Sequence, residues 1–343
     1  MGVRTLTPVR LPEPRGPLTE ALVSQLTSAP GTELKVPPAT GDWLDEDLQL
    51  ALYICYDLHY RGFADVPPAW EWDPGLLAAR ADMEEVFLSG IEAELGAVPS
   101  VEEQVEELLI EPLNGTGVSY HLLDRGERWQ AREYLVHRSL YHLKEADPQA
   151  WVIPRIHGTA QAALVAVEFD EYGAGRADAV HSRLFAEMMA DFDLDPAYGH
   201  YLDAVTAHSL AVVNLMSLFG LHRARRGALV GQFARVEITS SPSSRRLAEA
   251  LAALGAGADG TRFYREHIEA DALHEQLIRH DVIAALLDDE PDLEPDIAFG
   301  LAASALVDER LGTHLLSCWE RSRSSLREPL ADAPHSRQTG RPT

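Results

Sequence analysis

The chain has 343 residues with 54 acidic and 29 basic side chains, a net charge of −25, and 46% of its residues are hydrophobic. This length allows one large domain or two smaller ones, with enough apolar residues for a sizeable core. The acidic balance argues against nucleic acid or an anionic membrane as partners, because both require a basic surface. Two cysteines, Cys55 and Cys318, cannot form a disulfide framework and are expected to be buried thiols.

Two segments of the sequence indicate whether the protein is secreted or inserted in a membrane. The N-terminal residues MGVRTLTPVRLPEPRGP contain no apolar stretch of the kind found in secretory signals, so a cytoplasmic protein is expected. The least charged run, residues 204–222, contains His208, Asn214 and His222. It is therefore predicted to be a buried core helix rather than a membrane span.

The first 117 residues divide into two predicted parts. Residues 1–40 contain seven prolines and little apolar periodicity, which predicts an extended arm. Residues 41–117 are predicted to form an N-terminal helical region, with Asp42 capping a helix over 43–60 and further helices near 75–95 and 100–110. We expect this region to pack on the remaining chain and to form a homodimer interface. The loop LNGTG, residues 113–117, is the predicted boundary.

The chain after this loop follows helical periodicity, and no alternating β pattern is found. Helices are predicted near residues 126–146, 154–172, 178–191, 198–223, 224–240, 243–254, 261–288 and 295–320. The break between the two helices that meet near 241–244 is predicted from SPSS. Residues 118–322 are thus predicted to form an all-α domain, and the polar residues 323–343 a disordered tail.

One predicted helix has an unusual face. In FYREHIEADALHEQLIRH, residues 263–280, His267, Asp271 and His274 follow the spacing i, i+4, i+7 and share one side of the helix with Phe263 and Ile278. Burying imidazoles and carboxylates without partners is costly. The pattern therefore predicts a metal site or a hydrogen-bonded cluster, and the simpler alternative is a solvated helix with three ordinary polar residues.

A second polar pair surrounds a glycine-rich loop. Glu171 ends one predicted helix and His181 begins the next, and the glycines between them allow a tight connection that brings the two side chains together. Asp178 is an alternative partner for His181. We favour Glu171 and interpret Asp178 as a first-turn or capping residue.

Two further carboxylates have simple alternative explanations. Glu237 lies on an apolar helix face, where a salt bridge with Arg235 or Arg245 would explain it equally well. Glu145 lies near a helix end just before Pro148, and glutamates at such positions are usually solvated.

Carboxylates and imidazoles from several helices, without thiolates, are typical ligands of non-haem iron or manganese, and this number suffices for two metal ions. Zinc usually needs fewer ligands, and the cysteine count excludes a cysteine-rich structural site. The candidate metal ligands are Glu145, Glu171, His181, Glu237, His267, Asp271 and His274.

The blocks DEYGAG…HSRLF, EITSS and YREHIEADALHE together resemble the haem-oxygenase-like diiron oxidases and oxygenases, also called iron-containing redox enzymes. The resemblance covers roughly residues 120–320 and implies a seven-helix bundle similar to haem oxygenase, with iron ligands in place of haem. It implies that one iron is held by Glu171, His181, Glu237 and His267. Asp271 and His274 would hold the second, more weakly bound iron, with one carboxylate shared between the metals.

Glu145 and its neighbours LKEADP resemble the members of this family that oxygenate nitrogen, which carry an additional carboxylate on the first core helix. The resemblance implies an oxygenase that uses two Fe(II) ions, O2 as co-substrate and an external electron donor such as a reductase. The substrate would be a small metabolite with an amine, guanidine or amino-heterocycle nitrogen. The cupin domain of some members is not expected, because the residues after 320 have the composition of a tail.

Two other classes of function remain open. One is a diiron desaturase or oxidative C–C lyase of the same fold, acting on an amino or fatty acid. The other is a metal-free helical protein that binds a partner. The mass of the product distinguishes the first alternative from nitrogen oxygenation, and iron titration tests the second.

Overall fold

The computed structural model describes residues 9–31, 34–111 and 115–331, except for the side chains of Glu269, Asp271 and Ala272. Within these residues the fold is all-α, as predicted, and β-structure is limited to one isolated bridge between Val9 and Phe63. No helix in the described part of the chain is long and apolar enough to cross a membrane. Cys55 and Cys318 are both free and buried, which confirms that prediction.

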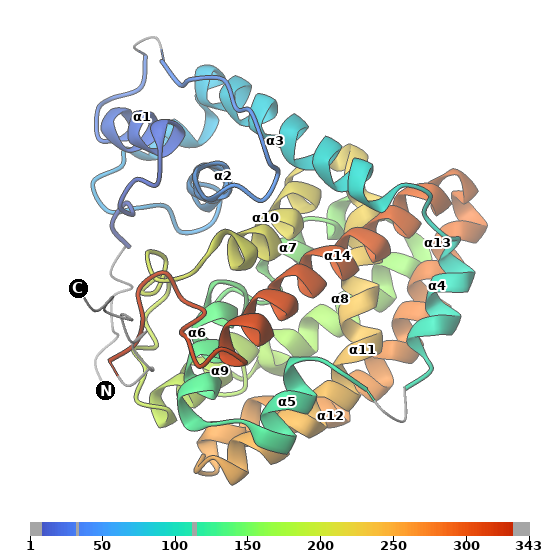
Figure 1. Ribbon diagram of the computed structural model, residues 1–343. Helices are drawn as coiled ribbons and strands as arrows, with labels where there is room; N and C mark the ends of the chain where they lie inside the picture. Colours follow the sequence, from blue (N-terminus) through green and yellow to red (C-terminus); the bar gives the residue numbers. More distant parts are fainter. Residues whose placement is uncertain (1–8, 32–33, 112–114, 332–343) are drawn as a thin grey trace.

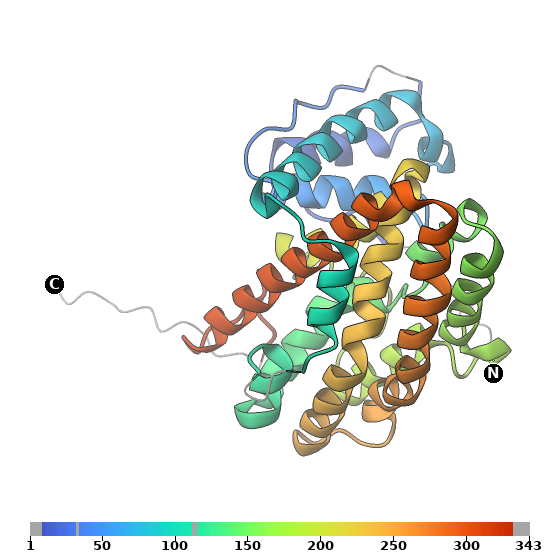
Figure 2. The ribbon, with the colours of Figure 1, turned by 90° about the vertical axis from the view of Figure 1, so that its right-hand side faces the viewer.

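Helices α1, α2 and α3 form a layer across one end of a larger helical bundle, and α4 runs along the side of the bundle (Figures 1 and 2). Their bounds are α1 (Pro17–Leu26), α2 (Glu46–Asp57), α3 (Pro74–Leu95) and α4 (Val101–Leu108). Helix α2 packs on α10 of the bundle, while α3 and α4 pack on α14. The prediction that this region packs on the rest of the chain is therefore confirmed.

The bundle contains the remaining helices. Their bounds are α5 (Val118–Arg125), α6 (Arg128–His142), α7 (Asp147–Ala150), α8 (Gly158–Glu171), α9 (His181–Asp191), α10 (Ala207–Leu221), α11 (Arg226–Ala253), α12 (Asp259–Gln276), α13 (Ala284–Asp289) and α14 (Glu294–Trp319). A π-helical stretch, Leu277–Ile283, joins α12 to α13. This arrangement fits the haem-oxygenase-like bundle expected from the sequence.

Helix α11 lies at the centre and packs on α10, α12 and α14. Its contact with α14 is close because glycines face carbonyl groups on both sides. A Cβ added at Gly231 would lie 2.0 Å from the oxygen of Ile297, and one added at Gly300 would lie 2.0 Å from that of Ala228. Both positions therefore require glycine, and the close contact fixes the helix that carries Glu237.

The predicted break in α11 is wrong, because the helix continues through Pro242. A proline inside a helix removes one backbone donor and leaves nearby carbonyl groups without their usual partners. Hydroxyl groups near Pro242 donate to helix carbonyls: Thr239 donates to the oxygen of Arg235, and Ser243 donates to those of Thr239 and Ser240. The residues of SPSS that suggested a turn therefore support the continuous helix.

The extended arm predicted for residues 1–40 is also partly wrong, because α1 lies within it. Pro17 occupies the first turn of α1, where a missing N–H costs nothing. The side chains of Leu18, Leu22 and Leu26 follow at spacings of four residues and are buried. The number of prolines obscured this periodicity; residues 1–8, 32 and 33 lie outside the described part.

Two helix starts differ from the prediction. Helix α2 begins at Glu46, and its cap is Asp45, whose carboxylate accepts hydrogen bonds from the backbone of Asp47 and Leu48. The proposed cap, Asp42, instead accepts a hydrogen bond from the backbone of Leu44 in the preceding turn. Helix α10 begins at Ala207 rather than 198, after a series of turns. The predicted loop at 113–117 includes residues 113 and 114, which lie outside the described residues.

The start of the predicted disordered tail is ordered. Ser325 and Leu326 are buried, and the carboxylate of Glu133 on α6 accepts hydrogen bonds from the backbone N–H and the hydroxyl of Ser325 at 2.9 and 2.6 Å. The polar sequence of this segment does not show that a buried carboxylate accepts its hydrogen bonds. Residues 332–343, the rest of the predicted tail, lie outside the described residues.

Candidate metal centre

The unusual face of α12 is buried, as predicted. Phe263, His267, His274 and Ile278 are each at most 7% exposed. The side chain of Asp271, which shares their spacing, lies outside the described residues. The alternative of a solvated helix face is therefore wrong for both histidines.

The first group of possible metal donors comes from four separate elements. It consists of Glu145 after α6, Glu171 at the end of α8, His181 at the start of α9, and His267 within α12. All four side chains are buried, and one ligand atom from each lies within 4.8 Å of the others. The Nδ1 atom of His181 is 2.7 Å from Oε2 of Glu171, and Nε2 of His267 is 4.0 Å from Oε2 of Glu145.

The second group consists of Glu171, Glu237 and His274, again all buried and with ligand atoms within 4.8 Å of one another. Nδ1 of His274 lies 3.2 Å from Oε2 of Glu237. Glu171 belongs to both groups, so one carboxylate lies between two clusters of donors. A carboxylate in this position has the geometry needed to be shared between two cations.

The structure brings the six described candidates together but groups them differently from the expectation. Glu145 lies with His181 and His267, where Glu237 was expected. Glu237 lies instead with His274. The difference arises because Glu145 is on a turn and not on a helix, so helical spacing could not place it.

Glu171, and not Asp178, is the partner of His181, as favoured from the sequence. Gly173 makes this possible: its φ is +76°, and an added Cβ would lie 2.6 Å from the backbone N of Val180. The chain can therefore turn tightly enough to bring the end of α8 beside the start of α9. The interpretation of Asp178 as a cap is wrong, because α9 begins at His181 after Val180 and Asp178 is exposed.

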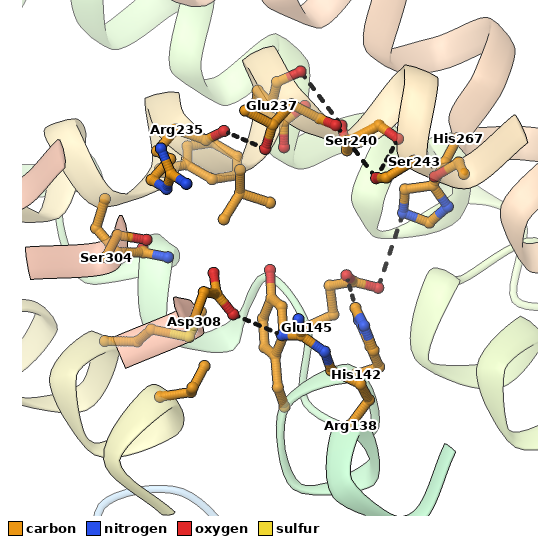
Figure 3. Close-up of a pocket in the computed structure, with 18 of the residues that line it drawn as sticks. Arg138, His142, Glu145, Arg235, Glu237, Ser240, Ser243, His267, Ser304 and Asp308 are labelled. Carbon is orange, nitrogen blue, oxygen red and sulfur yellow. Dashed lines mark hydrogen bonds and ion pairs between the residues drawn. The ribbon is translucent and has the colours of Figure 1, made fainter. Parts of the chain in front are cut away.

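Glu145 is not a solvated helix-end residue. Helix α6 ends at His142, and the chain turns inward with Ala146 at a φ of +72°. The Glu145 side chain is buried, and Nδ1 of His142 donates a hydrogen bond of 2.6 Å to its Oε1 (Figure 3). The other oxygen, Oε2, has no hydrogen-bond partner among the described residues. It faces His267 and is free to bind a cation.

Neighbouring groups determine which nitrogen each histidine offers. Nδ1 of His267 is 2.7 Å from the carbonyl oxygen of Phe263, which can only accept, so Nδ1 carries the proton and Nε2 presents its lone pair toward Glu145. Nε2 of His274 lies 3.2 Å from Oδ2 of Asp170, which leaves Nδ1 toward Glu237. Such partners fix the tautomer and orientation of metal-binding histidines.

His142 and Asp170 are therefore functional candidates that the sequence analysis missed. Both lie next to predicted site residues in the chain. A signal existed for Asp170, because it precedes Glu171 within DEYG. For His142 the useful signal was its position three residues before Glu145, which becomes meaningful only once the turn after α6 is known.

The second group has a strongly negative environment. Burial lowers the pKa of His274, but the hydrogen bond and charge of Glu237, together with Asp170, outweigh burial and raise this pKa to about 9. In the other group, burial lowers the pKa of His142, which favours the neutral ring that donates to Glu145. A buried region that stabilises positive charge in this way suits a cation.

These residues fit an iron centre. The donors are carboxylate oxygens and imidazole nitrogens without thiolates, which is the ligand chemistry of non-haem iron. Oε2 of Glu145 is a buried acceptor whose hydrogen-bonding capacity is unused by the described residues, as expected for a ligand atom.

A cavity of about 130 Å³ adjoins the donors. Glu145, Glu171, Glu237 and His267 contribute to its wall. The cavity continues between α6, α11 and α14, where its lining includes Arg138, Arg235, Ser304 and Asp308 (Figure 3). It is therefore large enough for a small organic molecule to lie against the carboxylates and the imidazole.

A helical bundle with buried carboxylate–imidazole clusters is typical of proteins that hold non-haem metal ions. The family of iron-containing redox enzymes matches residues 132–309, slightly more than half of the chain. The chain belongs to this family. The matched region begins within α6 and ends within α14, so it contains all seven candidate ligands.

A curated relative shares part of this region. Nitrosourea synthase from Streptomyces achromogenes subsp. streptozoticus is 27% identical over 172 residues. The similarity extends over 50% of this chain and 36% of that protein. The chain therefore matches little more than a third of the relative's length.

Proposed function

We propose that this protein is a non-haem diiron oxygenase that uses O2 and an external electron donor to oxidise a nitrogen atom of a small metabolite. Glu145, Glu171, His181 and His267 would hold one iron, and Glu171, Glu237 and His274 the other. Asp271, one turn before His274 on α12, is proposed as a further ligand of the second iron. Family membership and the two clusters that share Glu171 support this proposal.

Bound ferrous iron would supply the electrons and the open coordination positions needed to activate dioxygen. The chain's own residues would hold the ligands in place. His142 orients Glu145 through its hydrogen bond, and the carbonyl group of Phe263 accepts from Nδ1 of His267, which directs Nε2 toward Glu145. Asp170 and Glu237 orient the ring of His274 through contacts of 3.2 Å to its two nitrogens. The buried helix faces around the clusters limit access of water to the reacting atoms.

The burial of Glu145 is the observation that favours nitrogen over carbon as the site of oxidation. In the sequence, an additional carboxylate at this position was the feature shared with nitrogen-oxygenating members of the family. Its side chain lies within a donor cluster rather than in solvent. The similarity to nitrosourea synthase supports the same choice.

The test combines iron counting with product analysis. The full chain is loaded anaerobically with Fe(II) and then mixed with 18O2, a reductant and a panel of small amines, guanidines and amino acids. We expect two irons per chain and a product that has gained labelled oxygen on nitrogen. Glu145→Ala should lower iron retention and abolish this product, while the exposed Glu266→Ala on α12 should change neither.

Other products would change the assignment. A loss of two hydrogens, or a fragment shortened by carbon, would indicate the desaturase or lyase alternative. Normal iron retention and product formation in Glu145→Ala would show that Glu145 is not a ligand. Failure of the wild-type chain to retain iron would contradict the proposal as a whole.

A further inference from the structure

The cavity has a second end, away from the candidate metal ligands, and this end carries positive charge. Arg235 of α11 lies there with Ser304 and Asp308 of α14, whereas Glu145, His142 and His267 lie on the other side (Figure 3). The two ends therefore differ in chemistry: carboxylates and imidazoles lie at one, and two guanidinium groups with a single carboxylate lie at the other.

The two arginines in the cavity wall are not equivalent. Nη1 of Arg138 donates a 3.0 Å hydrogen bond to Oδ1 of Asp308, which neutralises its charge locally. The guanidinium of Arg235 makes no hydrogen bond or ion pair with any described residue. With two arginines and one aspartate, this end of the cavity has one uncompensated positive charge.

Other acidic groups do not compensate Arg235. Burial lowers its pKa, and the charges of Asp308, Glu107 and Glu309 oppose this effect from a distance. Glu107 and Glu309 are exposed, so water screens them, and Asp308 is already bound to Arg138. Removing a guanidinium from water without a partner costs free energy. An anion bound in the cavity would recover this cost.

We propose that Arg235 binds the carboxylate of a small, amino-acid-like substrate whose oxidisable nitrogen points toward Glu145 and His267. The identity of the reacting end rests on the proposed nitrogen oxygenation, whereas the carboxylate site rests on Arg235 and the cavity. A planar guanidinium can hold a carboxylate through two parallel hydrogen bonds, which fixes its orientation as well as its position. Arg235 is thus a specificity-determining residue.

The size of the cavity agrees with this class of ligand. A cavity of roughly 150 Å³ accommodates a benzene-sized molecule, and this one measures about 130 Å³. A compact ligand suits this space, whereas a fatty acid or a peptide would exceed it. The positive end would also select against amines that lack a carboxylate.

Matched pairs of ligands test the proposal. β-Alanine is compared with ethylamine, and 4-aminobutyrate with propylamine, because each amine is the acid without its carboxylate. Binding to the full chain is measured by calorimetry under anaerobic conditions, with and without Fe(II). We expect at least one acid to bind ten times or more tightly than its amine.

Variants show whether Arg235 is responsible. Arg235→Gln should weaken binding of the acid by about tenfold to a hundredfold, the loss expected for a charge-assisted hydrogen bond, and should remove the preference for the acid. Arg235→Lys should restore part of it. Arg245→Gln, an exposed position on the same helix, should behave like the wild type. The thermal midpoint of Arg235→Gln should not fall, because an unpaired guanidinium is removed.

Three results would overturn the inference: equal binding of acid and amine, no effect of Arg235→Gln, or no binding of either acid. Iron counting separates these results from a failure of the proposed function. If the wild-type chain retains iron but shows no preference for the acid, only the carboxylate site is wrong. If it shows the preference but retains no iron, the carboxylate site stands and the diiron proposal fails.

Discussion

At the scale of single residues, three candidate ligands are held by neighbours that are not themselves candidates. His142 holds Glu145, the carbonyl group of Phe263 holds His267, and Asp170 holds His274. These contacts are made by the chain's own residues, so the chain itself positions the donors. A preorganised site of this kind loses little conformational entropy when a cation binds.

Glu168 gives a prediction for pH dependence. Its carboxyl group is buried one turn before Glu171, and neither oxygen has a hydrogen-bond partner among the described residues. Burial, together with the charges of Glu171 and Glu237, raises its pKa to about 9. In the unfolded chain a glutamate ionises near about pH 4.3. The folded iron-free protein should therefore lose stability as the pH rises from about 4.3 toward 9.

Glu168→Gln should remove this loss, because glutamine stays neutral. The free energy of unfolding, measured with urea on iron-free protein, should fall with pH more steeply for the wild type than for the variant. The difference should approach but not exceed about 1.4 kcal/mol per pH unit. Glu266→Gln, an exposed change, serves as the control. Parallel curves for the wild type and Glu168→Gln would contradict the assigned pKa.

The sequence predicted the position of a candidate site residue well where that residue lies on a regular helix. The spacing of His267 and His274 places both on one buried face, and DEYG placed Glu171 near His181. It was less informative for Glu145, because a turn with a left-handed residue at Ala146 has no periodicity. The pairing of Glu237 with His274 depends on how α11 and α12 pack, which no local pattern contains.

At the scale of elements, helix α2 supports the turn that carries Glu145. Nζ of Lys144 lies 3.6 Å from Oδ1 of Asp57, and both side chains are 1% exposed. The ammonium group also lies over the ring of Tyr60, 4.1 Å from its centroid. Arg61 donates a 2.9 Å hydrogen bond to the carbonyl oxygen of Leu143. The two residues before Glu145 are thus fixed by the N-terminal layer.

Asp57→Asn should therefore affect both stability and iron binding. It leaves the ammonium group of Lys144 buried with no carboxylate partner, which should cost about 3 kcal/mol of unfolding free energy. Combining Asp57→Leu with Lys144→Met should restore much of the stability but not the iron retention. Urea unfolding and iron counting give the two readouts, with the exposed Asp82→Asn as control. Full iron retention in Asp57→Asn would show that α2 does not position Glu145.

The segment after α14 is a second support, bound to α6. The carboxylate of Glu133 is fully buried and accepts hydrogen bonds from Nε1 of Trp319 and from Ser324 and Ser325. Nε2 of His137, one turn later on α6, lies 3.0 Å from the hydroxyl oxygen of Ser325. These contacts tie the end of the described chain to the helix that precedes Glu145.

Glu133→Gln should weaken this attachment, because an amide has one acceptor oxygen and introduces an NH2 group among donors. The expected loss is about 2 kcal/mol of unfolding free energy, as for hydrogen bonds to a charged group. Thermal unfolding followed by far-UV circular dichroism measures it. The exposed Glu320→Gln should have no such effect, and an unchanged midpoint in Glu133→Gln would contradict the role of this segment.

The bounds of several helices were predicted well, including those of α3, α8 and α14. The errors arose where prolines and serines suggested a loop or a break and the structure has a helix. Pro242 lies inside the continuous helix α11, and the prolines near α1 concealed its buried leucines. The ordered segment at Ser325 could not be predicted, because its order depends on a carboxylate nearly 200 residues earlier.

At the scale of the whole molecule, the N-terminal layer is also the proposed homodimer interface. Large apolar side chains remain exposed in this region: Trp72 is 64% exposed, Leu109 44% and Ile110 73%. Light scattering at micromolar concentration should give the mass of a dimer. Ile110→Asp should produce monomers, whereas Phe169→Asp, which changes an exposed apolar residue on α8, should not. A monomeric wild-type chain, or dissociation by Phe169→Asp alone, would contradict this interface.

The central claim is that two buried donor clusters, joined by Glu171, hold two irons. Anaerobic titration of the full chain with Fe(II), followed by removal of unbound metal and colorimetric counting, tests this most directly. The account predicts two irons per chain in the wild type, about one in His274→Ala, and fewer than one in Glu171→Ala, because Glu171 belongs to both clusters. His200→Ala, at an exposed histidine, should retain two. A wild-type chain that retains no iron, or a Glu171→Ala variant that retains two, would contradict the account.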